Sequence, residues 1–153
     1  MAYCNYGFLY RTMGHYNRAI HCLDKALLCF EKGTDYVLET YYQKVRCLIK
    51  IRNYHHYAEI LEEGTKLAKD SDVYTILFNM LKCMADPNID NAEHLREEIL
   101  PYLIKNNYAS LALDCCIFLR EFYMNAGKGY KKRALEMGDA GFVILAKMIE
   151  GGK

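Results

Sequence analysis

The chain of 153 residues contains no tryptophan, only two prolines and no long uninterrupted run of apolar residues. The scarcity of proline and the absence of a Ser/Gly-rich stretch argue against a disordered tail or a flexible linker. No stretch approaches the roughly 18 apolar residues of a membrane span. Residues 1–5 also lack the charged lead and apolar run of a signal peptide. We therefore expect a cytoplasmic protein that does not contact membranes.

The sequence also lacks an excess of charge of one sign. Lys and Arg together number 20, against 19 Asp and Glu, so the basic surplus that covers nucleic-acid phosphates is missing. The seven cysteines include no C-x-x-C pair, which fits a reducing compartment. Tetrahedral metal sites need paired ligand spacings. We expect no direct binding of nucleic acid, no metal and no cofactor.

Motifs that carry catalysis are absent as well. The sequence has no Gly-rich phosphate loop, no nucleophile elbow and no H-E-x-x-H motif. Cys115 and Cys116 lie among Leu113, Ile117 and Phe118, and a thiol in an apolar helix is inert. We expect no catalytic residue and no enzymatic activity.

What the sequence does contain is a repeated helical pattern, which is clearest in residues 2–30. Two apolar helical faces are separated by a turn at Gly14-His15-Tyr16-Asn17. Small residues at Gly7, Ala19 and Ala26 let the two helices approach each other. The pattern resembles the tetratricopeptide repeat, whose signature positions are Tyr3, Tyr6, Gly7, Tyr10, Gly14, Tyr16, Ala19, Leu23 and Ala26.

Further copies of the pattern follow. Adding 38 to each number gives the second copy, and two degenerate copies come after it, so we place the repeats at about 2–33, 36–70, 72–106 and 108–150. The resemblance implies an all-α fold, a right-handed superhelical stack of antiparallel helix pairs (an α-solenoid) that forms a single domain over residues 1–153. Helical periodicity begins at Tyr3 without a cap. We therefore also expect this chain to be the C-terminal piece of a longer protein.

Local signals predict where some of these helices begin or bend. Gly33 and Asp35 are expected to close one helix and cap the next. Asp90, with Glu93 three residues on, resembles a capping box. Pro101 lies inside a helical run and should kink or divide it. The apolar end of the last helix, from Phe142 to Ile149, needs cover, either by the preceding pair or in a homodimer through the C-terminal helix.

The resemblance also implies a binding groove lined by the first helix of each pair. Carried across residue by residue, the groove positions supply amides, cations and apolar side chains. An extended peptide requires these groups for its backbone, its carboxylates and its side chains. The predicted peptide-binding groove consists of Asn5, Phe8, Arg11, Tyr42, Gln43, Arg46, Lys50, Asn79 and Lys82.

A narrower resemblance concerns the role of the chain. The phrases YRTMGHYNRAIHCLDKALLCFEKGTD and YMNAGKGYKKRALEMG are similar in style to bacterial peptide-pheromone receptors, which include Rap-type phosphatases and NprR- and PlcR-type transcription regulators. This resemblance implies a peptide-binding sensor domain of a quorum-sensing transcription regulator. A general protein–protein interaction scaffold is the alternative, and a structural module without a groove ligand is a third.

Overall fold

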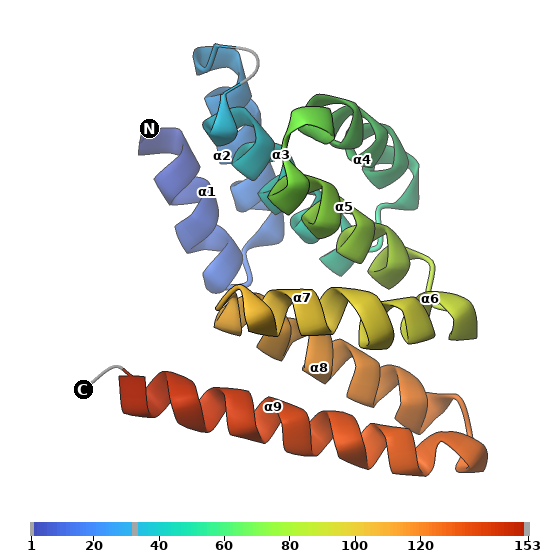
Figure 1. Cartoon of the computed structure of the whole chain (residues 1–153). Helices are drawn as coiled ribbons and strands as arrows, with labels where there is room; N and C mark the ends of the chain where they lie inside the picture. The colour runs from blue at the N-terminus through green and yellow to red at the C-terminus, as the bar shows by residue number, and fades with distance from the viewer. Residues whose placement is uncertain (1, 32–33, 152–153) are drawn as a thin grey trace. The chain divides into compact units, whose positions relative to one another are not determined.

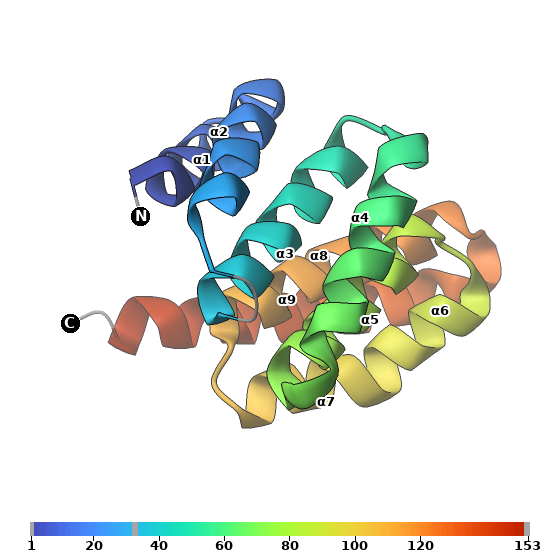
Figure 2. The same ribbon diagram turned by 90° about the horizontal axis from the view of Figure 1, so that it is seen from above.

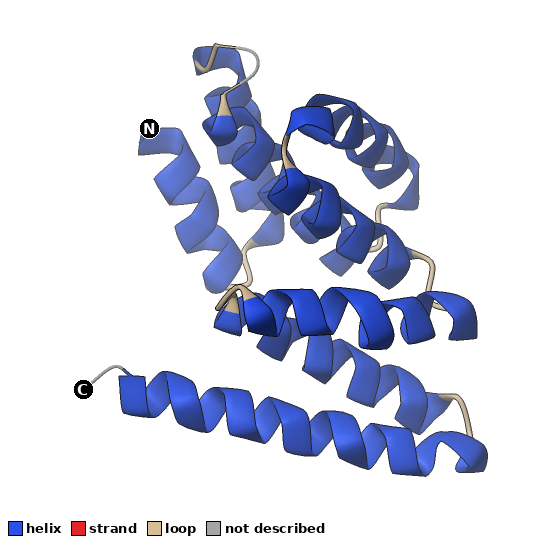
Figure 3. Ribbon diagram, in the orientation of Figure 1, coloured by secondary structure: helices blue, strands red, loops and turns tan. Residues whose placement is uncertain are grey.

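The computed structural model describes residues 2–31 and 34–151, in which every regular element is a helix and no strand occurs (Figure 3). The predicted all-α class is therefore confirmed. The α-helices are α1 (Ala2–Thr12), α2 (Tyr16–Cys29), α3 (Asp35–Lys50), α4 (Tyr54–Leu67), α5 (Asp72–Ala85), α6 (Ile89–His94), α7 (Leu100–Lys105), α8 (Ala109–Asn125) and α9 (Lys131–Gly151). Short 3-10 helices at Ala68–Asp70 and Lys128–Tyr130 and a π-helical turn at Leu95–Ile99 complete the set.

The backbone contacts group the chain into two compact units, Met1–Ala85 (unit 1) and Asp86–Lys153 (unit 2). In unit 1, α1 pairs with α2, α3 packs against both, and α5 packs against α3 and α4 (Figures 1 and 2). In unit 2, α8 pairs with α9 and also contacts α7. The antiparallel helix pairs that the sequence indicates are therefore present inside each unit. The assignment of one domain to residues 1–153 stays a prediction.

Glycine allows the two helices of the first pair to approach closely. A Cβ atom on Gly7 would lie 2.7 Å from two side-chain atoms of Leu23, a separation that real Cβ atoms do not adopt. Ala19 and Leu23 of α2 form a fully buried cluster with Cys47 of α3. The turn between α1 and α2 uses Gly14 at φ 76°, in the left-handed region where glycine is favoured.

A second close approach joins α4 to α5. Gly64 of α4 is buried against the ring of Phe78, and a Cβ atom at position 64 would lie 2.5 Å from the Phe78 Cζ atom. Phe78 is itself 1% exposed and meets Tyr42 of α3 edge to face. The ring of Phe78 therefore links three helices, and it fits only because position 64 has no side chain.

Two of the predicted helix starts differ from the structure. α3 begins at Asp35, and Thr34 occupies the N-cap position that we assigned to Asp35, while Gly33 lies outside the described residues. In unit 2 the N-cap of α6 is Asn88, whose side chain accepts a 2.9 Å hydrogen bond from the Asn91 backbone N–H. The predicted capping box from Asp90 is therefore wrong, because Asn caps a helix as well as Asp does.

The helical run from residue 89 to residue 105 is continuous but not uniform. Pro101 carries no N–H and its ring crowds the carbonyl four residues earlier. The chain forms a π-helical turn over Leu95–Ile99 directly before it, in which the Leu100 N–H donates to the Leu95 carbonyl. A π turn is wider than an α turn. The expected disturbance near Pro101 therefore takes the form of a local widening.

A polar cluster fixes the helices of unit 2 to one another. The Glu93 carboxylate accepts hydrogen bonds from the Tyr123 hydroxyl at 2.7 Å and from Arg96 at 2.7 Å, and it pairs with Arg133 at 2.9 Å. Burial acts to raise the pKa of the Glu93 carboxyl. The hydrogen bonds from Tyr123 and Arg96 and the charges of Arg96 and Arg133 outweigh burial and hold this pKa below its usual range. Glu93 thus acts as a structural anchor between α6, α8 and α9.

The contact between Gly64 and Phe78 gives a stability prediction. Gly64→Val should lower the free energy of unfolding by about 2 kcal/mol, because the added atoms meet a buried ring that cannot move aside. Urea unfolding followed by circular dichroism measures this change. Gly129→Val is the matched control, since nothing lies within 4 Å of a Cβ at position 129. Equal effects of the two substitutions would contradict the packing account.

Candidate functional site

The predicted groove residues come from α1, α3 and α5, and α3 contacts both of the other helices. The structure places these residues at three depths. Arg11 and Arg46 are partly buried, while Tyr42 and Gln43 are only 2% and 5% exposed. The exposed members are Asn5, Phe8, Lys50, Asn79 and Lys82. Whether the nine line one groove stays a prediction, but α1 and α3 do bring several of them together.

Tyr42 supports a cation from beneath. Its ring lies 5.5 Å from the guanidinium carbon of Arg46, and it also meets the ring of Phe78 edge to face, with ring centroids 6.3 Å apart. A guanidinium over an aromatic face is attracted by the ring quadrupole. Tyr42 therefore holds Arg46 in place rather than standing open as an apolar pocket.

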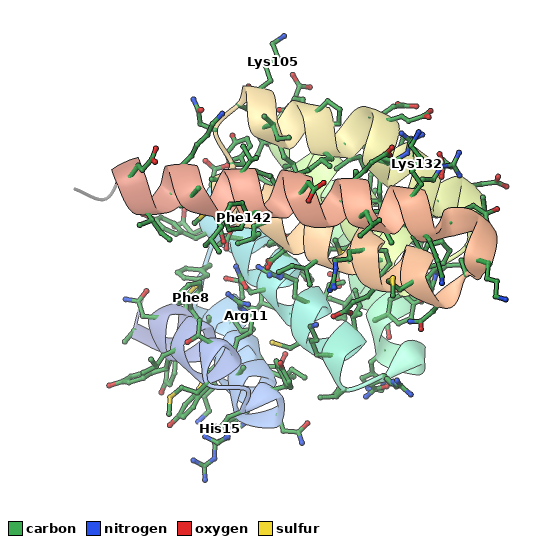
Figure 4. The ribbon with its side chains drawn as sticks, turned by 90° about the horizontal axis from the view of Figure 1, so that it is seen from below. Phe8, Arg11, His15, Lys105, Lys132 and Phe142 are labelled. Carbon is green, nitrogen blue, oxygen red and sulfur yellow. The ribbon has the colours of Figure 1, made fainter. Side chains whose placement is uncertain are left out.

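A similar pair occurs on α1, where the guanidinium carbon of Arg11 lies 5.1 Å from the centre of the Phe8 ring. Figure 4 shows both side chains on the same side of this helix. Burial raises the pKa of the Cys47 thiol to about 11, and the charges of Arg11 and Arg46 act against that rise. Since both guanidinium groups act on one thiol of α3, they belong to the same local environment.

A chain of hydrogen bonds crosses from α3 to α5. The Gln43 Nε2 atom donates to Glu39 Oε1 at 2.6 Å, and the Tyr74 hydroxyl donates to Glu39 Oε2 at 3.2 Å. Burial raises the pKa of Tyr74, and the Glu39 carboxylate raises it further. Both oxygens of Glu39 are therefore engaged by donors from this unit.

The same chain leaves one acceptor without a donor. Gln43 Oε1 is buried and has no hydrogen-bond partner within residues 2–31 and 34–151. The amide cannot rotate to exchange the two atoms, because its NH₂ group is held by Glu39. A buried carbonyl without a donor costs about 1 to 3 kcal/mol. A donor from a water or from another molecule would remove that cost.

Sequence reasoning missed two members of this network. Glu39 lies four residues before Gln43 on the same face of α3, and Tyr74 lies in the first turn of α5. Outside this network, Thr40 of α3 contacts Cys4 of α1, with 3.7 Å between Thr40 Oγ1 and Cys4 Sγ. The i, i+4 spacing of Glu39 and Gln43 was a usable signal. Nothing in the sequence indicated that Tyr74 reaches Glu39.

In the described part of the chain, no group of three His, Cys, Asp or Glu residues is arranged to hold a metal ion. No helix in that part of the chain is long and apolar enough to cross a membrane. The network around Gln43 and the two stacked arginines is thus the strongest candidate for binding.

One known protein family resembles part of this chain. A family model of the tetratricopeptide repeat matches residues 2–28, which covers α1 and nearly all of α2. Neither the curated proteins nor the solved structures yielded a match. The first helix pair is therefore similar to a tetratricopeptide repeat, and the chain has the all-α, paired-helix architecture of such repeats. Repeats of this kind typically form non-enzymatic scaffolds for protein–protein interaction.

The hydrogen bond between Tyr74 and Glu39 can be tested through stability. Tyr74→Phe should lower the free energy of unfolding by about 1 kcal/mol at pH 7, because it removes the donor to a carboxylate and leaves the ring in place. Tyr36→Phe is the control, since the Tyr36 side chain is about half exposed and its ring stacks on Phe30. A Tyr74→Phe protein as stable as wild type would show that the bond contributes nothing.

Alkaline pH should destabilise the fold. Burial raises the pKa of Tyr41 to about 12 and also raises the pKa values of Tyr74 and Tyr123. An unfolded tyrosine ionises near pH 10, so the folded state retains protons that the unfolded state releases. The tyrosine contribution is intact below about pH 10 and decreases above it, by up to about 1.4 kcal/mol per pH unit for each group.

Urea unfolding at pH 8, 9, 10 and 11 measures this decrease. Because lysines also titrate in this range, the comparison with Tyr74→Phe isolates one tyrosine. The stability difference between wild type and Tyr74→Phe should shrink as the pH rises above about 10. A difference that stays constant up to pH 11 would contradict the assignment.

Proposed function

We propose that unit 1 is a protein–protein interaction module that holds a segment of its partner against α1, α3 and α5. The buried Gln43 carbonyl carries this proposal, because it is an acceptor held in place by Glu39 and lacks a donor within the described residues. An extended polypeptide supplies backbone N–H groups as donors. The similarity of residues 2–28 to a tetratricopeptide repeat supports the same conclusion.

The charges near Gln43 indicate which segment would fit. Arg46 and Lys50 follow Gln43 by three and seven residues on one face of α3. At 1.5 Å per residue they lie about 4.5 Å and about 10 Å further along the helix axis. An extended chain advances about 3.3 Å per residue. A segment that donates an N–H to Gln43 would thus place acidic side chains near these cations one to three residues away.

Two further cations, Arg11 and Lys82, lie on the flanking helices α1 and α5. Glu39, the acidic residue close to Gln43, already accepts two hydrogen bonds from unit 1. We therefore propose that the partner segment is acidic. Its affinity should fall as ionic strength rises, because exposed charges are screened over about 8 to 10 Å at physiological salt.

The narrower form of the proposal is the peptide sensor that resembles bacterial peptide-pheromone receptors. In this form the segment is a short free peptide, and its binding would shift the packing or association of the helices to regulate transcription. The Gln43 carbonyl supports the binding step, since a short peptide and a protein segment offer it the same backbone N–H. The two forms differ in the size of the ligand.

The first experiment measures thermal unfolding of the chain with peptides of five to ten residues that carry acidic, neutral or basic side chains. A ligand that binds only the folded state raises the midpoint by mass action. We expect a rise with acidic peptides that decreases with added salt. A rise with basic peptides alone would contradict the proposed charge preference.

Variants locate the binding site. Gln43→Met removes the carbonyl acceptor while nearly preserving side-chain length, and Lys50→Ala removes an exposed cation. Each should weaken binding of the acidic peptide about tenfold, which corresponds to about 1.4 kcal/mol. Lys69→Ala, an exposed lysine that follows α4, is the matched control and should leave binding unchanged.

The pattern of results separates the two forms. Binding of short acidic peptides that Gln43→Met weakens supports the sensor form. In the other case, an acidic segment binds only when it is part of a folded partner. If Gln43→Met weakens that binding, the result supports the scaffold form and excludes the sensor form. Binding that is indifferent to both Gln43→Met and Lys50→Ala would place the site elsewhere and overturn the proposal.

A further inference from the structure

The described part of the chain exposes two apolar surfaces, and the first lies on α1 and the turn that follows it. Ala2, Tyr6, Leu9 and Met13 follow one another at intervals of four, three and four residues, so they share one helical face. We call them the α1 stripe. All four are exposed, and Leu9 is 50% exposed. This face is distinct from the one that carries Phe8 and Arg11.

The second surface lies on the last helix pair. Four of the exposed apolar side chains of α9 recur at intervals of seven, three and four residues, namely Leu135, Phe142, Leu145 and Ile149. The most exposed of them is Phe142, at 72% (Figure 4). A row on α8 runs beside them, because a Cβ on Gly138 would touch Arg120 and a Cβ on Gly141 would touch Leu113. We call this surface the α8–α9 face; it consists of Ile117, Met124, Leu135, Phe142, Leu145 and Ile149.

Unit 1 contains an example of a helix that packs on a pair of antiparallel helices. Within unit 1, α3 packs on the pair formed by α1 and α2. Thr40 of α3 contacts Cys4 of α1, Lys44 pairs with Asp24 of α2 at 2.7 Å, and Cys47 packs against Ala19 and Leu23 of α2. Positions 40, 44 and 47 therefore form the face of α3 that packs on the pair of α1 and α2.

The α1 stripe occupies the equivalent positions in the preceding repeat. Subtracting the repeat period of 38 from 40, 44 and 47 gives Ala2, Tyr6 and Leu9, three members of the stripe. In α1 these positions are exposed, whereas in α3 they pack against a helix pair. The described residues thus present an exposed packing face on α1 and, on the pair formed by α8 and α9, an exposed apolar face.

We propose that the chain associates head-to-tail with a second copy of itself, the α1 stripe of one copy packing on the α8–α9 face of the next. The arrangement repeats between copies the packing that α3 makes on α1 and α2. The two faces differ, so the contact is heterologous. In a pair of copies, one copy keeps an unused α8–α9 face and the other keeps an unused α1 stripe.

None of the four residues of the α1 stripe and none of the six residues of the α8–α9 face carries a full charge, so these ten residues bring none into the contact. Arg120, which lies between Ile117 and Met124 on α8 and borders Gly138, has to keep its guanidinium group in water at the edge of the contact. α1 has 11 residues and is about 16 Å long, so the contact is smaller than a standard interface of about 800 Å² per partner. The association should be weak and reversible.

Sedimentation equilibrium tests the proposal with the whole chain from about 10 μM to about 1 mM, the range in which weak interfaces dissociate. The average mass should rise above 17.8 kDa with concentration. Leu9→Asp disables the α1 stripe and Phe142→Asp disables the α8–α9 face, and each variant alone should remain a monomer. Leu28→Asp, at a side chain 87% exposed on α2, is the matched control and should associate like wild type.

A mixture of the two variants gives the decisive result. The Leu9→Asp copy retains an intact α8–α9 face and the Phe142→Asp copy retains an intact α1 stripe. The mixture should therefore form a one-to-one dimer that does not grow further with concentration. Circular dichroism checks that each variant is folded. Met13→Asp and Ile149→Asp provide a second pair if either substitution disturbs the fold.

Three outcomes would overturn the proposal. A wild-type chain that stays monomeric up to about 1 mM would show that the two faces do not bind each other. Loss of association in Phe142→Asp but not in Leu9→Asp would indicate a two-fold contact between α9 helices instead. A mixture of the two variants that remains monomeric would exclude the head-to-tail arrangement.

Discussion

The close approach of helices at positions without a side chain is the constraint on which this structure depends. Gly7 admits Leu23 within the first pair, Gly64 admits Phe78 between α4 and α5, and Gly141 contacts Cys116 in the last pair. Aromatic and leucine side chains then fill the remaining space. Because protein interiors are densely packed, these glycines determine how closely the helices of these three pairs approach each other and which side chains fill the contact.

That constraint has a direct effect on the polar network of unit 1. The ring of Phe78 reaches Tyr42 only because Gly64 leaves room for it, and Tyr42 in turn supports Arg46. Tyr74 on the same helix donates to Glu39, which holds the Gln43 amide. The stacked arginine and the oriented carbonyl are therefore consequences of apolar packing one layer below them. The proposed site is thus carried by helices, which hold side chains more precisely than loops do.

The all-α fold could be predicted from the sequence because the residues that determine each helix pair lie close together in the chain. The small residues at Gly7 and Ala19, the turn at Gly14 and the 3.6-residue periodicity of apolar side chains all act within one helix pair. Helix starts were less certain, as Thr34 and Asn88 show, because several neighbouring residues can cap the same helix. The burial of Tyr42 and Gln43 and the bond from Tyr74 to Glu39 were not predictable. They depend on how separate helices cross, which a periodic pattern does not encode.

The π-helical turn at Leu95–Ile99 has a consequence for how this helix can change over evolutionary time. A π turn holds one more residue than the α-helical turn it replaces, and here the additional residue is confined to the segment before Pro101. On either side of this turn, Glu93 of α6 accepts a hydrogen bond from Tyr123 of α8, and α7 also contacts α8. A single-residue insertion in this helix is thus accommodated where it occurs, without rotating the apolar face of every residue that follows.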